Sequence, residues 1–134
     1  MDSGLRFAAI DIGSNAIRLL FSRIIEKEND NPFFIKESLI RMPLRLGNDA
    51  FTAGVISEKN CDNFLNTLHG FKHLIDAYQP ISFRACATAA MRNAKNGIKL
   101  VERVKEETGI QVDIINGQEE ASMILSRNIS QYLN

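Results

Sequence analysis

The sequence predicts a single α/β domain in which helices flank a mixed five-stranded sheet. Two observations predict this class. The first third of the chain reads as consecutive apolar strands joined by turns, whereas from residue 57 onward segments with a period of 3.6 alternate with short apolar strands. The chain has 134 residues and is 45% hydrophobic, which is sufficient for one ordinary domain with its own core.

Three strands are expected in the first third of the chain, at Arg6–Ile12, Ala16–Ile25 and Phe33–Met42. A Gly-Ser-Asn turn joins the first two into a β-hairpin, and an Asn-Asp-Asn-Pro stretch separates the second from the third. Because turns join these neighbouring strands, we expect all three to pair antiparallel. The next segment, Pro43–Val55, has no helical period and is expected to be a loop.

Two helices are predicted by apolar residues spaced three and four apart. The first begins after Ser57, a residue type favoured at the N-cap, and ends before Pro80. Its apolar face comprises Cys61, Phe64, Leu65, Leu68, Phe71, Leu74, Ile75 and Tyr78. The second helix is expected from near Asn96 to Gly109, a favourable helix-ending residue. Its apolar face comprises Ile98, Val101 and Val104.

Short strands are expected at Ile81–Ala87 and Ile110–Ile115, and a final helix after Asn116. Strands separated by helices normally become parallel neighbours through right-handed crossovers. Three antiparallel strands followed by helix-connected parallel strands form the ribonuclease H-like half-domain arrangement. Ligands in such sheets bind at the loops of one edge, where we expect three segments to converge: Asp11–Asn15, Thr88–Arg92 and the helix start at Glu119 and Glu120.

Composition and charge limit the kinds of partner that this chain is expected to bind. The 16 basic and 16 acidic residues give no net charge, so neither a nucleic acid nor a membrane is the expected partner. The N-terminus lacks the pattern of a signal peptide, and a cytoplasmic location is the default expectation. Cys61 and Cys86 are expected to be reduced core residues. His69 and His73 are spaced like metal ligands but are expected to lie on a solvated helix face.

The turn after the first strand is the candidate binding site. Gly13 can take a positive φ and Asn15 tolerates the left-handed region, so a turn around Ser14 can direct backbone N–H groups toward an anion such as phosphate. Asp11, at the end of the strand, could hold a hydrated Mg²⁺ against that phosphate. The alternative is an ordinary tight hairpin in which Asp11 is a turn residue.

Two arginines beyond the third strand are further candidates. Arg41 and Arg45 could steer an anionic substrate, and the alternative is that both are ordinary exposed arginines.

Four motifs in this order resemble the exopolyphosphatase/guanosine pentaphosphate phosphohydrolase (Ppx/GppA) family. They lie in the segments Phe7–Leu20, Ala87–Asn96, Glu102–Gly109 and Ile115–Ala121, and Arg45-Leu46-Gly47 falls where the family has a similar loop. The resemblance covers nearly the whole chain. It implies the fold of the actin, sugar kinase and Hsp70 superfamily, whose phosphate-binding cleft lies between two half-domains.

The resemblance also implies roles for individual residues. Asn15 matches a phosphate-contacting asparagine, Gly13 and Ser14 match the backbone of the phosphate loop, and Arg92 matches an arginine that binds a phosphoryl oxygen. Bidentate guanidinium geometry suits the last task. Glu120 matches the catalytic glutamate that activates the attacking water.

The neighbouring carboxylates have other expected tasks. Asn116 and Glu119 have the spacing of a capping box, which leaves Glu120 the freer glutamate. Asp11 would help to hold Mg²⁺, directly or through water.

The sequence departs from the family pattern at three positions. Ala16 and Ala89 stand where the family usually has serine, and Ser122 stands where it has arginine. A second glycine-rich phosphate loop, resembling Asp-Ile-Gly-Gly-Gly-Ser, would begin beyond Asn134.

Residues 1–134 are therefore expected to be the N-terminal half-domain of a longer two-domain protein. The resemblance implies a phosphatase that hydrolyses the terminal phosphate of inorganic polyphosphate or guanosine pentaphosphate. The alternatives are a catalytically silent module that binds phosphate or a guanosine alarmone, and a phosphotransferase of the same superfamily. The expected partner is the second half-domain, and a homodimer is also possible.

Overall fold

The computed structural model describes residues 4–26 and 31–116. Five strands form one sheet: β1 (Leu5–Ile12), β2 (Ile17–Ile25), β3 (Phe33–Met42), β4 (Ser82–Ala87) and β5 (Val112–Ile114). The predicted strand β3 has the expected bounds, and the expected bounds of β1, β2 and β4 differ by one residue at one end. The final helix expected after Asn116 lies outside the described residues.

The strand order is β3-β2-β1-β4-β5. Strands β1 and β2 pair antiparallel, as do β2 and β3, whereas β4 is parallel to both β1 and β5. The mixed five-stranded sheet with three antiparallel strands in a row is therefore confirmed. Its order is that of the predicted ribonuclease H-like half-domain, and it places the carboxyl ends of β1, β4 and β5 at one edge.

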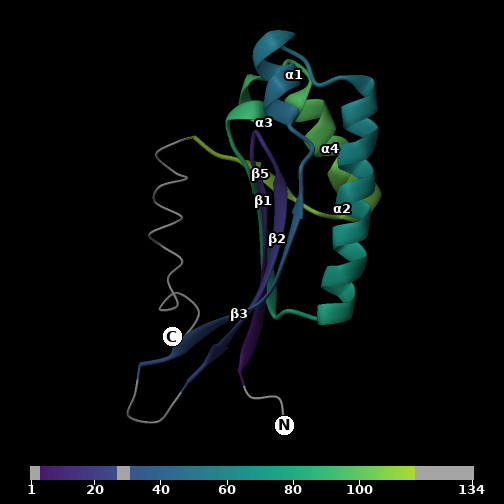
Figure 1. Cartoon of the computed structure of the whole chain (residues 1–134). Helices are drawn as coiled ribbons and strands as arrows, with labels where there is room; N and C mark the ends of the chain where they lie inside the picture. The colour runs from purple at the N-terminus through teal and green to yellow at the C-terminus, as the bar shows by residue number, and fades with distance from the viewer. Residues whose placement is uncertain (1–3, 27–30, 117–134) are drawn as a thin grey trace.

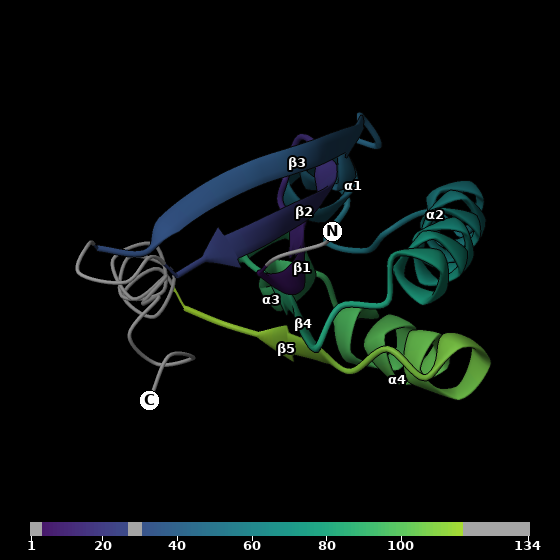
Figure 2. The ribbon, with the colours of Figure 1, turned by 90° about the horizontal axis from the view of Figure 1, so that it is seen from below.

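The helices occupy two positions relative to the sheet. Helices α2 (Glu58–Tyr78) and α4 (Gly97–Thr108) lie on one face of it, as the two perpendicular views show (Figures 1 and 2). Helices α1 (Leu46–Thr52) and α3 (Ala89–Asn93) lie at the end that carries the turn between β1 and β2 (Figure 1). No helix within the described ranges is long and apolar enough to cross a membrane.

The core lies between the sheet and the long helices. Alternate residues of β1 and β2 point into it, because successive side chains of a strand face opposite sides. Fully buried side chains include Ile10, Ile12, Ile17, Leu19, Phe64 and Leu68. Phe64 and Leu68 lie on α2, where Thr67 is also buried and Cys61 is partly buried. This packing confirms α2 as a core helix.

Two apolar residues predicted to face the core are exposed. Ile98 is 67% exposed and Leu74 is 41% exposed. In α4 the buried side is formed by Leu100, Val101 and Val104. At about 100° per residue, Ile98 lies roughly 200° around the helix from Leu100, so it cannot share the centre of that face.

The ends of the long helices follow the predicted local signals. The Ser57 hydroxyl accepts a hydrogen bond from the Asn60 N–H at 3.2 Å, which is the geometry of an N-cap. Gly109 follows α4 with a φ of 80°, a conformation that suits glycine. Asn96 precedes α4, but its side chain does not cap the helix. It instead accepts from the Ile56 N–H and donates to the Ile56 carbonyl, both at 2.9 Å.

The prediction of loops at Pro43–Val55 and Thr88–Arg92 was wrong, since α1 and α3 form there. Helices this short give no periodic signal and depend on tertiary contacts. The carboxylate of Asp49 in α1 accepts hydrogen bonds from the Ser57 N–H at 2.9 Å and from Asn60 Nδ2 at 2.8 Å. These bonds, the Ser57 backbone bond foremost, lower the pKa of Asp49 and tie α1 to the start of α2.

Both cysteines are reduced thiols, as predicted. Cys86 is buried and Cys61 is partly buried, and desolvation raises the pKa of each thiol above its ordinary value. Neither thiol is thereby activated as a nucleophile.

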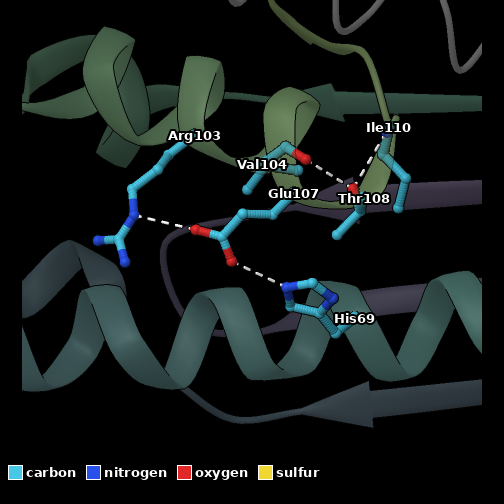
Figure 3. Close-up of polar contacts among 6 residues, drawn as sticks. All are labelled: His69, Arg103, Val104, Glu107, Thr108 and Ile110. Carbon is cyan, nitrogen blue, oxygen red and sulfur yellow. Dashed lines mark hydrogen bonds and ion pairs between the residues drawn. The ribbon is translucent and has the colours of Figure 1, made fainter.

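Polar contacts join α2 to α4, and others lie at the C-terminal end of α4 (Figure 3). His69 Nε2 lies 2.9 Å from Glu107 Oε1, and Arg103 Nε donates to Glu107 Oε2 at 3.1 Å. The Thr108 hydroxyl donates to the Val104 carbonyl at 2.7 Å. No group of three or more metal-ligating side chains exists in the described ranges. His69 thus belongs to a helix-to-helix contact.

The contacts of Glu107 predict a pH-dependent contribution to stability. The hydrogen bond with His69 is the main cause that lowers the pKa of Glu107 in the folded chain. A lowered folded-state pKa stabilises the fold above the unfolded pKa, and this contribution is lost as the pH falls through the folded pKa. We expect Glu107→Gln to lower the melting temperature at about pH 6, and the difference to shrink toward about pH 3.

Thermal unfolding followed by circular dichroism across this pH range measures the effect. Glu102→Gln, which removes an exposed carboxylate from the same helix, is the matched control. An equal pH dependence of the two variants would contradict the assigned role of Glu107.

Candidate functional site

The turn between β1 and β2 is a tight structure closed by its own backbone. The Gly13 N–H donates to the Ala16 carbonyl at 3.0 Å. A Cβ at Gly13 would lie 3.3 Å from the same oxygen, which explains why glycine is favoured there. Gly13 and Asn15 do not use the positive φ that the sequence would permit. Among described non-glycine residues, positive φ occurs at Arg45 and Gln79.

The segment that begins α1 clamps the outer side of this turn. The Gly47 N–H donates to the Ser14 carbonyl at 2.8 Å, and the Arg45 N–H donates to the Asn15 carbonyl at 3.1 Å. A Cβ at Gly47 would lie 2.7 Å from Ser14 Cβ, closer than carbon atoms can pack. Glycine at position 47 therefore allows the close approach on which the clamp depends.

The clamp orients two backbone donors. In a trans peptide the carbonyl and the following N–H point in opposite directions. Since the Ser14 and Asn15 carbonyls face residues 45–47, the N–H groups of Asn15 and Ala16 point away from that segment. Neither N–H donates a hydrogen bond within the described part of the chain. Two adjacent donors of this kind suit an anion.

These residues line an open cavity of about 300 Å³. Four predicted site residues meet there, together with Ala16 and two arginines. The lining comprises Asp11, Gly13, Ser14, Asn15, Ala16, Arg18 and Arg41.

Charged side chains cross three strands beside the turn. Asp11 on β1 stands opposite Arg18 on β2, and the two form an ion pair. Arg18 in turn stands opposite Arg41 on β3. Arg18 was not a predicted site residue. Its signal was available in the hairpin, because a four-residue turn that pairs Ile12 with Ile17 also pairs Asp11 with Arg18.

Of the two arginines proposed to steer an anion, only Arg41 lines the cavity. Arg45 is exposed and contributes its backbone N–H to the clamp.

The second predicted phosphate-binding segment lies at the same edge of the sheet. The Thr88 N–H donates to the Ile12 carbonyl at 3.2 Å, and the Ile115 N–H donates to the Ala87 carbonyl at 2.9 Å. These bonds join the ends of β1, β4 and β5. Arg92 is exposed on α3, where its Nη1 donates to the Ile115 carbonyl at 2.6 Å, and it is not among the residues that line the cavity.

Glu120, the predicted catalytic glutamate, lies outside the described residues, as do Glu119 and Ser122. Their positions relative to the cavity stay predictions.

Asp11 is the carboxylate in the cavity lining, and its side chain is 40% exposed. Mg²⁺ at phosphate sites is often held by one or two carboxylates, with phosphate oxygens and water completing the coordination. A half-exposed carboxylate beside an anion cavity fits that chemistry. Arg18 shares the Asp11 carboxylate, so a metal ion would compete with the guanidinium for it.

Two glycine substitutions, one in the clamp and one outside it, should have opposite effects on the stability of the chain. Gly47→Ala should destabilise the chain by about 1–3 kcal/mol, because the added methyl group forces Ser14 and α1 apart. Gly70→Ala is the control, since nothing lies within 4 Å of its added Cβ on α2. It should stabilise the chain by about 0.5–1 kcal/mol. Denaturant unfolding measures both, and equal stability of the two variants would refute the proposed close packing.

Known proteins resemble this chain over most of its length. The model of the Ppx/GppA phosphatase family matches residues 25–133. The bifunctional 3-dehydroquinate synthase/phosphatase of Fusobacterium nucleatum is 31% identical over 128 residues, which are 93% of this chain and 19% of that protein. Exopolyphosphatase 1 of Mycobacterium tuberculosis is 26% identical over 119 residues, which are 89% of this chain and 33% of that protein.

Solved structures share both the fold and the sequence. A Ppx/GppA family member from Aquifex aeolicus superimposes with a TM-score of 0.77 at 32% identity, over 87% of this chain and 36% of that one. An exopolyphosphatase from Cytophaga hutchinsonii gives a TM-score of 0.74 at 32% identity, with the same coverage.

The chain thus spans between one fifth and about one third of the length of the relatives that it matches. These neighbours confirm the ribonuclease H-like fold of the actin, sugar kinase and Hsp70 superfamily. With a family model that covers most of the sequence and solved family members that share its sheet and helices, the chain belongs to the Ppx/GppA phosphatase family.

Proposed function

We propose that this chain is one wall of the active site of a phosphatase that hydrolyses the terminal phosphate of inorganic polyphosphate or guanosine pentaphosphate. The main observation that supports this proposal is the cavity at the turn, where two backbone N–H groups and two arginines meet. The exopolyphosphatases among its relatives support this substrate class. The second half-domain of the same protein would supply the opposite wall.

The terminal phosphate would lie against the turn. The N–H groups of Asn15 and Ala16 would donate to its oxygens, and the Asn15 side chain would add a further donor. Gly13 and Ser14 hold the backbone in this shape. Arg92 uses one guanidinium nitrogen on the Ile115 carbonyl, and its remaining N–H groups could bind a phosphoryl oxygen.

Glu120 would act on the attacking water. The carboxylate would orient the water and accept its proton as the new P–O bond forms, while the bond to the leaving phosphate breaks. Asp11 would hold Mg²⁺, which supplies neutralisation of phosphate charge when bound. Arg18, released from Asp11 in that state, would face the phosphate as well.

A catalytically silent module that binds phosphate or a guanosine alarmone is the second candidate. It is favoured by Ala16, which lines the cavity at a position where the family usually has serine. Binding without phosphate release would identify this function. Transfer of phosphate to an acceptor other than water would identify a phosphotransferase instead.

Substitution of Glu120 tests the hydrolase proposal in the complete native protein. Glu120→Gln should reduce kcat for phosphate release by about 10²–10⁴-fold, because the amide cannot accept the proton of the water. Phosphate binding should persist, since the shape of the side chain is kept. Glu119→Gln is the control and should retain most activity. Unchanged turnover in Glu120→Gln would overturn the assignment of the base.

Substitution of Asp11 tests the metal proposal. Asp11→Asn should raise the Mg²⁺ concentration required for half-maximal phosphate release by roughly tenfold or more, because it removes the carboxylate charge beside the cavity. Asp113→Asn is the control, since Asp113 is an exposed carboxylate on β5 that lies 3.9 Å from Arg84 Nε. A magnesium titration with unchanged midpoint in Asp11→Asn would exclude Asp11 as a metal ligand.

A further inference from the structure

We propose that Arg41 forms a second phosphate subsite, which binds the penultimate phosphate of a linear phosphoanhydride chain. The terminal phosphate of that chain would lie at the turn beside Asn15. This inference rests on the proposed function, because it assumes that the cavity receives a terminal phosphate. It adds a specificity-determining residue: Arg41 would distinguish a chain of two or more phosphates from orthophosphate.

The register of the sheet places the charges in one row. Across neighbouring strands the order is Arg41, Arg18, Asp11, Cys86 and Asp113. The row is positive on the β3 side and negative on the β5 side. A polyanion bound at the turn would therefore extend toward Arg41, because the β3 end of the row carries the positive charge.

Arg41 differs from four other arginines that the structure describes. Arg18, Arg23, Arg84 and Arg103 each lie within an ion-pair distance of a carboxylate. Arg41 has no such carboxylate among residues 4–26 and 31–116, although it is exposed and lines the cavity. With respect to these described residues, its guanidinium is available to bind an external anion.

The pairing of Arg41 with Arg18 strengthens this inference. Like charges directly opposite each other on neighbouring strands destabilise a sheet. Asp11 compensates one of the two charges through its ion pair with Arg18, and the other charge is left without a counterion in the described ranges. An anion bound between the strands would relieve the repulsion.

The placement of the donors indicates a ligand longer than orthophosphate. The turn and Arg41 on β3 line the same cavity from different elements, so they present two binding positions. One phosphate at the turn fills the first. The second requires a further phosphate linked to it, as in pyrophosphate, tripolyphosphate or the 5′ end of a nucleoside triphosphate.

Calorimetric titration of the complete native protein tests the subsite, with orthophosphate, pyrophosphate and tripolyphosphate at constant ionic strength and without added metal. Arg41→Gln should weaken pyrophosphate and tripolyphosphate binding by roughly tenfold and orthophosphate binding by less than about twofold. Lys36→Gln is the matched control: it removes a positive charge from an exposed residue of the same strand, outside the cavity lining, and should change each affinity by less than about twofold.

Three results would overturn the subsite: an equal loss for all three ligands in Arg41→Gln, an equal loss in Lys36→Gln, or no detectable binding of these phosphates to the unmodified protein. Failure of the proposed hydrolase activity is distinguishable from these. In that case the complete native protein releases no phosphate, while Arg41→Gln still selectively loses the longer ligands.

Discussion

The phosphate-loop geometry depends on two hydrogen bonds, from the N–H groups of Gly47 and Arg45 to the carbonyls of Ser14 and Asn15. Without them, the carbonyls of a surface turn would be free to rotate toward the cavity and repel an anion. With both carbonyls engaged, peptide planarity directs the next two N–H groups the other way. An anion site is thus prepared before any ligand arrives, which lowers the ordering cost of binding.

The clamp is itself fixed by the scaffold. Leu46 and Ala50 of α1 are buried in the core, and Asp49 joins α1 to the N-terminus of α2. The Asn96 side chain holds both backbone groups of Ile56, so the segment between α1 and α2 is tied to the start of α4. A turn that looks peripheral is therefore coupled to both long helices. Such support from packed elements is what keeps binding geometry precise in solution.

Different groups that could bind a ligand lie at different positions along one edge of the sheet. The ends of β1, β4 and β5 meet there through backbone hydrogen bonds, and α3 brings Arg92 to the same edge. The charge row beside the turn adds direction, since its cations lie toward β3 and its carboxylates toward β5. A neutral chain thereby contains a locally polarised surface, which net charge alone conceals.

The sequence by itself determined the order of the five strands and the two long helices, the helix signals at Ser57 and Gly109, and the turn at Gly13. Hydrophobic period and turn chemistry are local properties. It could not reveal α1, whose seven residues are held by burial and by distant partners. Only the tertiary structure decided that Arg41 shares the cavity while Arg45 lies outside it. Strand register and long-range packing place those side chains, and neither leaves a periodic trace in the sequence.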